Sequence, residues 1–140
     1  MRYLLDTNIF VYSAIDVDSL SKDVRAILED YDNTFCISSE SVKELIVAYR
    51  NKGLGARYWK TPEAMVKAIE DDYGIAILPI AKEHMLTYSQ LQLNEAQGHK
   101  DPSDHIIIAQ AITEKLPLIS SDTRFLFYRN QGLELIFNTK

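Results

Sequence analysis

The stretch Tyr3-Leu4-Leu5-Asp6-Thr7-Asn8 places a short apolar run directly before an acidic residue. An apolar run without polar alternation is typical of a strand in a parallel sheet that is covered on both faces. Asp6 then follows the end of that strand, and α/β folds bind ligands outside the carboxyl ends of their strands. We therefore expect Asp6 to lie at a functional edge of an α/β sheet.

The same alternation of apolar runs and helix-like stretches continues along the chain. Helical spacing is clearest at Val42, Leu45, Ile46 and Tyr49, which recur at i, i+3, i+4 and i+7. Further strands are predicted at 34–37, 75–78, 116–120 and 133–137, and helices at 8–14, 22–28, 39–52, 61–73, 81–94 and 101–112, with a short helical turn after residue 122. Strands and helices that alternate through short connections indicate an α/β domain with a parallel sheet.

Length and composition indicate one globular domain over residues 1–140. Hydrophobic residues make up 46% and charged residues 25%, which excludes disordered, collagen-like and coiled-coil chains. Asp6 interrupts any signal-peptide core, and no apolar run approaches the roughly 18 residues of a membrane helix. The single cysteine, Cys36, excludes an internal disulfide and stands in an apolar run, where we expect a buried thiol. The sequence thus predicts a cytoplasmic protein.

The net charge of −5 comes from 15 basic and 20 acidic side chains. It argues against a protein that coats nucleic acid electrostatically. It leaves open an enzyme that contacts phosphate through a bound metal, because acids gathered in one site would inflate the negative count.

Five acids stand just after predicted strands or in the first two turns of predicted helices, namely Asp6, Glu44, Asp101, Asp104 and Asp122. All of them can converge on one edge of the sheet. Carboxylates that gather in one place repel each other, so a cation normally compensates them. Ligand sets made only of oxygen favour hard cations such as Mg²⁺ or Mn²⁺.

Each acid also has a purely structural interpretation. Asp6, Asp101 and Asp122 are well placed to cap the helices that follow them. Glu44 can lie on a solvated helix face beside a lysine, which is what we expect for Glu40. The joint placement of the acids, rather than any single residue, favours a site.

Four segments, 5–12, 37–45, 101–110 and 118–125, carry these acids in a recurring context of apolar and small polar residues. The first reads Leu5-Asp6-Thr7-Asn8, and the last reads Ser120-Ser121-Asp122 followed by Phe125. In this order, and covering most of the chain, the segments resemble the four motifs of PIN-domain ribonucleases. The closest resemblance is to the VapC-type toxins of type II toxin–antitoxin pairs.

The resemblance implies a PIN-like three-layer α/β/α domain with a central parallel sheet of about five strands. It implies a metal-dependent endoribonuclease that leaves 5′-phosphate and 3′-hydroxyl ends, forms a homodimer and binds a cognate antitoxin. One or two Mg²⁺ or Mn²⁺ ions would be held by Asp6, Glu44, Asp104 and Asp122, with Asp101 as an auxiliary acid and Asn8 and Ser120 as polar helpers.

One position departs from the family pattern. Many relatives carry Arg directly after the third acid, where this chain has His105. Neutral histidine prevails near pH 7, so an electrostatic role of this position is in doubt. We expect His105 on the helix surface.

An acidic nuclease still needs contacts to RNA. Basic residues that can hold flanking phosphates are Arg57, Lys60, Lys100 and Arg124. Tyr58 or Trp59 can stack on a base. Side chains of these types are more often solvated or packed than functional, so we treat all six as weak candidates.

The sequence does not fit two other α/β classes with acidic sites. Haloacid dehalogenase-type phosphatases require a second Asp two residues after the first, where this chain has Asn8. Receiver domains require paired acids and a phosphorylatable Asp after the third strand, where the predicted strand 75–78 instead ends at Pro79. Two alternatives stay open: a PIN-fold RNA-processing nuclease without an antitoxin, and a PIN-fold module that binds RNA or protein without cleaving.

Overall fold

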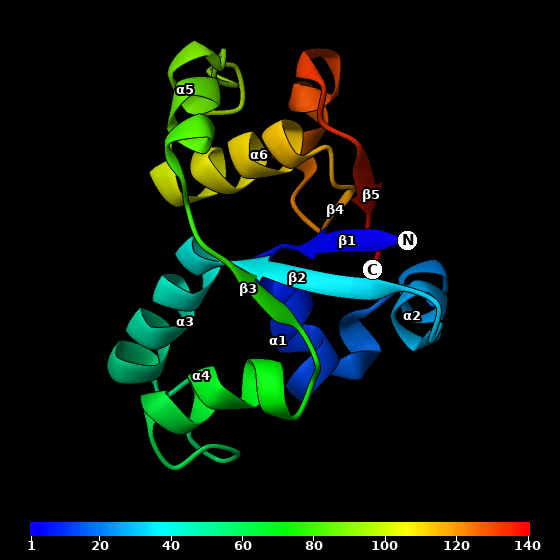
Figure 1. Ribbon diagram of the computed structural model, residues 1–140, viewed down its shortest axis with the longest axis vertical. Coiled ribbons are helices and arrows are strands. Elements are labelled where there is room, and N and C mark those ends of the chain that lie inside the picture. Colours follow the sequence, from blue (N-terminus) through cyan, green and yellow to red (C-terminus); the bar gives the residue numbers. More distant parts are fainter.

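A five-stranded parallel sheet forms the centre of the computed structural model, which describes residues 1–140 (Figure 1). Its strands are β1 (Arg2–Leu5), β2 (Thr34–Ser38), β3 (Ala76–Leu78), β4 (Leu118–Ser120) and β5 (Leu135–Phe137). Their order across the sheet is β3-β2-β1-β4-β5, with every neighbouring pair parallel. The first strand therefore lies in the middle, flanked by β2 and β4.

Helices cover both faces of this sheet (Figure 1). The α-helices are α1 (Thr7–Ile15), α2 (Lys22–Glu29), α3 (Ser39–Lys52), α4 (Pro62–Asp71), α5 (Lys82–Gln90) and α6 (Pro102–Glu114), and the 3₁₀ helices are η1 (Val17–Ser19) and η2 (Thr123–Gln131). Helices α1 to α4 lie on one side, and α5, α6 and η2 lie on the other. The predicted three-layer α/β/α architecture is confirmed. None of the helices has the length and apolar character needed to cross a membrane.

Alternate residues of each strand feed two separate cores. Leu5 and Ile37 point into the core beneath α1 to α4, whereas Leu4 and Cys36 point into the core beneath α6 and η2. All four are fully buried. Burial on both faces explains why the strands read as continuous apolar runs, and it confirms the buried thiol of Cys36.

Hydroxyl caps fix where several helices begin. Ser21, Ser38 and Thr61 accept hydrogen bonds from backbone N–H groups in the first turns of α2, α3 and α4, at 3.3, 3.1 and 3.0 Å. Gly53 ends α3 with φ at +70°, a left-handed conformation that glycine adopts without strain. These local signals place the helix ends close to their predicted positions.

Two helix ends differ from the sequence prediction by more than two residues. Helix α5 ends at Gln90 instead of reaching residue 94, because Asn94 donates its backbone N–H to the Tyr128 hydroxyl and a side-chain N–H to the carbonyl of Arg124. The helical turn after residue 122 continues as η2 to Gln131. The loop after α5 thus packs against η2. This contact joins segments that are about 30 residues apart in the sequence.

Candidate active site

The first two acids follow the ends of neighbouring strands. Strands β1 and β4 pair in register, and the backbone N–H of Asp6 donates to the carbonyl of Ile119 at 3.0 Å. The Ser120 hydroxyl donates to Asp6 Oδ2 at 2.7 Å and accepts the backbone N–H of Asp122 at 3.1 Å. A buried serine thus joins the two strand-end acids.

The third acid comes from α3, on the other side of β1. Asp6 caps α1 by accepting the backbone N–H of Thr7 at 2.9 Å. The hydroxyl of Thr7 donates to Glu44 Oε1 at 2.7 Å. The short first helix therefore fixes the position of Glu44 relative to Asp6.

The remaining acids lie at the start of α6. Asp101 caps this helix by accepting the backbone N–H of Ser103 at 2.9 Å, as predicted, and Asp104 follows within the first turn. The Ser103 hydroxyl donates to Glu40 of α3 at 2.8 Å, and Glu40 also pairs with Lys43. Glu40 thus has the predicted lysine partner and in addition ties α3 to the helix that carries Asp104.

These elements enclose one acidic pocket of about 210 Å³. It is lined by Asp6, Thr7, Asn8, Glu44, Asp101, Asp104, Asp122 and Arg124. Ligand atoms of Glu44, Asp101 and Asp104 all lie within 4.8 Å of one another. Every acid predicted for the site reaches the pocket, Asn8 lines it, and Ser120 lies buried behind Asp6. The donor set is almost entirely oxygen, which suits a hard divalent cation.

Two of the acids are held where ionisation is unfavourable. Burial, together with the charges of Asp104 and Asp122, raises the pKa of Asp6 to about 7. Burial and repulsion by the other acids likewise raise the pKa of Asp104 to about 7. The pKa of Glu44 is raised for the same reasons, with burial the largest. A cation in the pocket would relieve this repulsion.

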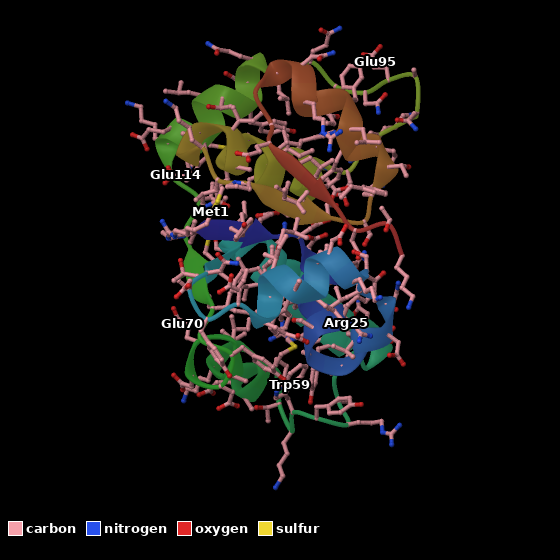
Figure 2. All side chains as sticks on the ribbon, turned by 90° about the vertical axis from the view of Figure 1, so that its right-hand side faces the viewer. Met1, Arg25, Trp59, Glu70, Glu95 and Glu114 are labelled. Atoms are coloured by element: carbon pink, nitrogen blue, oxygen red, sulfur yellow. The ribbon has the colours of Figure 1, made fainter.

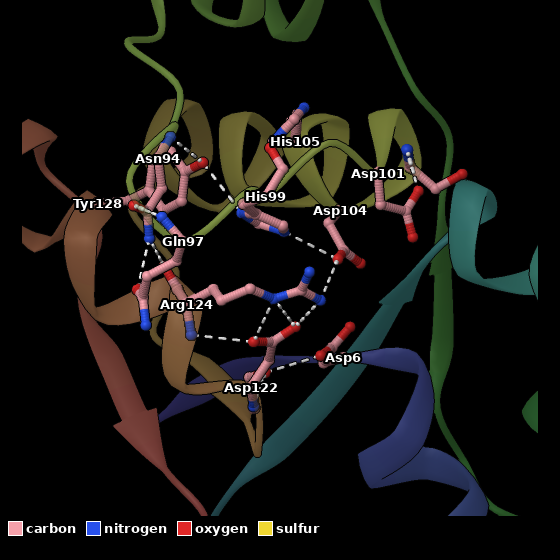
Figure 3. Close-up of polar contacts among 12 residues, drawn as sticks. Asp6, Asn94, Gln97, His99, Asp101, Asp104, His105, Asp122, Arg124 and Tyr128 are labelled. Atoms are coloured by element: carbon pink, nitrogen blue, oxygen red, sulfur yellow. Dashed lines mark hydrogen bonds and ion pairs between the residues drawn. The ribbon is translucent and has the colours of Figure 1, made fainter.

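Ionisation of Asp122 is favoured instead, because Arg124 donates hydrogen bonds to its carboxylate (Figure 3). The guanidinium donates from Nε to Asp122 Oδ1 at 3.0 Å and from Nη2 to Oδ2 at 2.7 Å, and Nη2 lies 3.9 Å from Asp104 Oδ2. Burial opposes ionisation of Asp122, but the hydrogen bonds and charge of Arg124 outweigh it and hold its pKa below the ordinary value. Arg124 is therefore the one positively charged side chain that lines the pocket.

A buried histidine from the loop before α6 contacts Asp104. His99 Nε2 lies 2.9 Å from Asp104 Oδ2, and Nδ1 lies 3.0 Å from the Tyr128 hydroxyl (Figure 3). The side chain of His99 has no exposed surface. Burial and the nearby charge of Arg124 lower the pKa of His99, which favours its neutral form.

The prediction for His105 is wrong. This residue is only 2% exposed, and its Nε2 donates to the backbone carbonyl of His99 at 3.0 Å. Its ring packs against that of His99, with centroids 4.7 Å apart. His105 supports the loop from inside the protein because α6 turns this face toward η2 and the loop.

The predicted RNA contacts divide into two groups. Arg124 lines the acidic pocket, whereas Arg57, Lys60 and Lys100 are exposed and lie outside its lining. Trp59 stacks on Phe10, with centroids 6.4 Å apart, at the end of the molecule opposite Glu95 (Figure 2). Trp59 is thus a packing residue, and of the two aromatic candidates only Tyr58 is exposed.

Sequence reasoning missed Thr7, His99 and Tyr128. Thr7 stands between two predicted site residues, so its place in the first motif was an available signal. His99 fell in a stretch predicted as a polar loop, and Tyr128 lay beyond the predicted helical turn. Thr7 contacts Glu44 and His99 contacts Tyr128 across long stretches of sequence, so these contacts have no local signature.

Fold and pocket together define an α/β/α protein with an acidic site at the carboxyl edge of a parallel sheet. Comparison with protein families then identifies the chain: it belongs to the PIN-domain family, whose profile matches residues 3–131. The resemblance drawn from the four motifs is thereby confirmed. A comparison with curated protein sequences finds no match.

Solved structures with the same fold include several toxin–antitoxin systems. A chain of VapBC2 from Rickettsia felis, bound to a DNA fragment from its promoter, is similar with a TM-score of 0.72 and 22% identity, over 98% of both chains. VapBC-1 from nontypeable Haemophilus influenzae gives 0.68 and 23% over the whole of both chains. VapBC-5 from Mycobacterium tuberculosis gives 0.66 and 19%, over 97% of this chain and 98% of that one. At these identities the likeness establishes the fold.

Proposed function

We propose that this PIN-domain protein is a metal-dependent endoribonuclease and the toxin of a toxin–antitoxin pair. One observation carries the proposal: four acids from separate elements of the fold, Asp6, Glu44, Asp104 and Asp122, converge on one pocket. For two of them the pKa is raised to about 7, so the metal-free arrangement is electrostatically unfavourable. Such a cluster is explained by a cation that binds it.

Asp6, Glu44, Asp104 and Asp122 would hold one or two Mg²⁺ or Mn²⁺ ions, with Asp101 as an auxiliary acid at the rim. The fit is supported by the oxygen-rich donor set and by the mutual approach of Glu44, Asp101 and Asp104 within 4.8 Å. When bound, a divalent cation supplies Lewis acidity toward water and phosphodiester oxygens.

The chain's own residues prepare the pocket for this chemistry. Ser120 orients Asp6, and Thr7 orients Glu44 through a hydrogen bond to Oε1. Glu44 would act either as a metal ligand or as the base that orients a water molecule, because its carboxylate lines the pocket and accepts only the neutral hydroxyl of Thr7. Arg124 supplies a positive charge beside the acids, where a phosphate would approach.

RNA is the substrate class that the family resemblance implies, and Arg57, Lys60 and Lys100 are weak candidates for contacts to flanking phosphates. An antitoxin partner and a homodimer belong to the same proposal. Support for the antitoxin comes from the structural neighbours, which are described as toxin–antitoxin systems. A cytoplasmic location would agree with this role.

Helix α3 offers a matched pair of variants, Glu44→Gln and Glu40→Gln. Both glutamates lie on α3 four residues apart, but only Glu44 lines the pocket. Purified protein should cleave RNA in the presence of Mn²⁺ or Mg²⁺ and stop when EDTA is added. Glu44→Gln should lose most of this activity, whereas Glu40→Gln should retain most of it, since glutamine still accepts the Ser103 hydrogen bond.

RNA cleavage that persists in EDTA, or that survives Glu44→Gln unchanged, would contradict the proposed nuclease. The antitoxin is tested separately: if a small protein is encoded next to this gene, its co-expression should give a complex with the chain and suppress cleavage of RNA. A PIN-fold processing nuclease would cleave RNA without such a partner.

A further inference from the structure

We propose that His99 is a positioning residue that fixes the orientation of the Asp104 carboxylate for metal binding. This inference rests on the proposed function, because it takes Asp104 as a metal ligand. It is carried by a chain of hydrogen bonds that runs from the loop after α5, through η2, to the acidic pocket (Figure 3).

The direction of each hydrogen bond in this chain follows from the groups involved. An ionised Asp104 can only accept, so His99 Nε2 carries the proton at the 2.9 Å contact. A neutral imidazole then has an unprotonated Nδ1, which accepts from the Tyr128 hydroxyl at 3.0 Å. The hydroxyl oxygen of Tyr128 in turn accepts the backbone N–H of Asn94 at 3.0 Å. Every donor has an acceptor, so the chain selects one tautomer of His99.

Packing holds the imidazole ring in this orientation. Its centroid lies 4.7 Å from that of His105, 5.5 Å from that of Phe125 and 5.6 Å from that of Tyr128. His105 also donates to the backbone carbonyl of His99. Rotation of the ring would leave buried polar atoms without hydrogen-bond partners, which is unfavourable.

Each of the four acids accepts a hydrogen bond from a neighbouring side chain. Ser120 donates to Asp6, Thr7 donates to Glu44, and Arg124 donates to Asp122. The His99 contact is the only hydrogen bond made by the Asp104 carboxylate. It engages Oδ2 and leaves Oδ1 without a partner. Donors that orient a ligating carboxylate in this way typically change metal affinity 10–100-fold when they are removed.

The test is calorimetric titration with Mn²⁺ alone, on the full chain, with His99→Leu and His99→Gln. Loss of the imidazole in His99→Leu should weaken Mn²⁺ binding about tenfold or more. Glutamine carries an amide N–H near the position of Nε2, so His99→Gln should restore most of the affinity. The matched control is His84→Leu, which removes another buried histidine that lies outside the pocket and should leave Mn²⁺ affinity unchanged.

A second measurement does not depend on how well the leucine variant folds. Nitrogen-15 NMR of histidine-labelled wild-type protein at pH 8.5, where Asp104 is ionised, should show His99 protonated at Nε2 and unprotonated at Nδ1. Tyr128→Phe removes only the hydroxyl, so it should shift the His99 ring nitrogens and weaken Mn²⁺ binding while the protein stays folded.

The outcomes separate this inference from the proposed function. If wild type binds Mn²⁺ and Asp104→Asn weakens binding, but folded His99→Leu binds as wild type does, the positioning role of His99 is wrong and the metal site stands. An Nδ1-protonated His99 would also overturn the inference. Wild-type protein that binds no Mn²⁺ would overturn the proposed function and this inference together.

Discussion

Asp6 and Asp122 occupy equivalent places in the fold but have opposite electrostatic environments. Each follows a strand of the sheet, β1 or β4, and each caps the helix that comes next. Asp6 is 7% exposed and is oriented by a neutral serine, and its pKa is raised to about 7. Asp122 is more exposed and bound by a guanidinium, and its pKa is lowered.

The comparison of Asp6 with Asp122 shows that strand order determines where an acid lies in the fold. The neighbouring side chains determine its pKa and so its protonation state. The carboxylates of Asp6, Glu44 and Asp104 form one half of the pocket and accept no hydrogen bond from a guanidinium; the nearest approach is Arg124 Nη2, 3.9 Å from Asp104 Oδ2. The other half, formed by Asp122, already holds Arg124. A divalent cation should therefore gain most of its binding free energy from the first half.

The largest expected effect is loss of RNA cleavage in Asp6→Asn. Asparagine keeps the size of the side chain and caps α1 as well as aspartate does, so the fold should persist. Loss of a ligand worth about 3 kcal/mol in the transition state slows the reaction about 150-fold. Cleavage rates with Mg²⁺, together with circular dichroism, check this, and a folded variant with normal activity would refute the site.

The second prediction concerns pH and the metal-free protein. Between the ordinary pKa of 3.8 and about 7, Asp6 keeps its proton in the folded state but loses it on unfolding. This contribution to stability is therefore complete below pH 4 and disappears as the pH rises to about 7; a shift of about three pKa units corresponds to roughly 4 kcal/mol. Asp122, with its lowered pKa, contributes in the opposite sense and loses its contribution on acidification.

Urea unfolding of wild type and Asp6→Asn across pH 4–8, without divalent ions, measures this difference. The stability of Asp6→Asn relative to wild type should increase as the pH rises to about 7. A difference that stays constant over this range would show that Asp6 is ionised in the folded protein throughout.

The third prediction concerns Asp104→Asn, whose stability relative to wild type should change sign when Mg²⁺ is added. Asparagine still accepts the hydrogen bond from His99 but carries no charge, so like-charge repulsion with the other acids disappears. Above pH 7 the free energy of unfolding of the metal-free variant should equal that of wild type or exceed it by up to about 1 kcal/mol. With saturating Mg²⁺ wild type should become the more stable protein, because it gains binding free energy that the variant lacks. Thermal melts that show lower metal-free stability and the same Mg²⁺ shift as wild type would make Asp104 a structural acid.

The smallest effect on stability should come from Arg124→Gln, which removes the positive charge that distinguishes the Asp122 half of the pocket from the other half. The Arg124–Asp122 pair is partly exposed, so its loss should cost no more than about 1 kcal/mol of metal-free stability. The pKa of Asp122 should rise toward that of Asp6, which carboxyl NMR titration can follow. An unchanged pKa would mean that Arg124 is not what keeps Asp122 ionised.

Much of this arrangement was predictable from the sequence because parallel strands share one carboxyl edge. Asp6 and Asp122 follow apolar runs, and Asp101 and Asp104 open a helix that begins with Pro102. These are local signals, and the short connections leave few topologies that would separate the acids. The spacing within the second motif then favoured Glu44 over Glu40.

What the sequence did not reveal depends on how the loop after α5 folds against α6 and η2. His99 and Tyr128 are 29 residues apart and meet only because the loop after α5 packs on η2. His105 was expected at the surface because its polar side chain gives no sign of burial, yet a carbonyl of that same loop is its partner. Charge within the pocket was equally hidden, since it depends on burial and on Arg124.

The most direct test of the account is calorimetric titration of wild type and Asp6→Asn with Mn²⁺ at pH 7, in two buffers of different ionisation enthalpy. Wild type should bind Mn²⁺ and release protons to the buffer, because carboxyls with pKa values near 7 must ionise to bind. Asp6→Asn should bind at least about tenfold more weakly. No binding by wild type, or equal affinity in the two proteins, would contradict the claim that this pocket is a divalent-metal site.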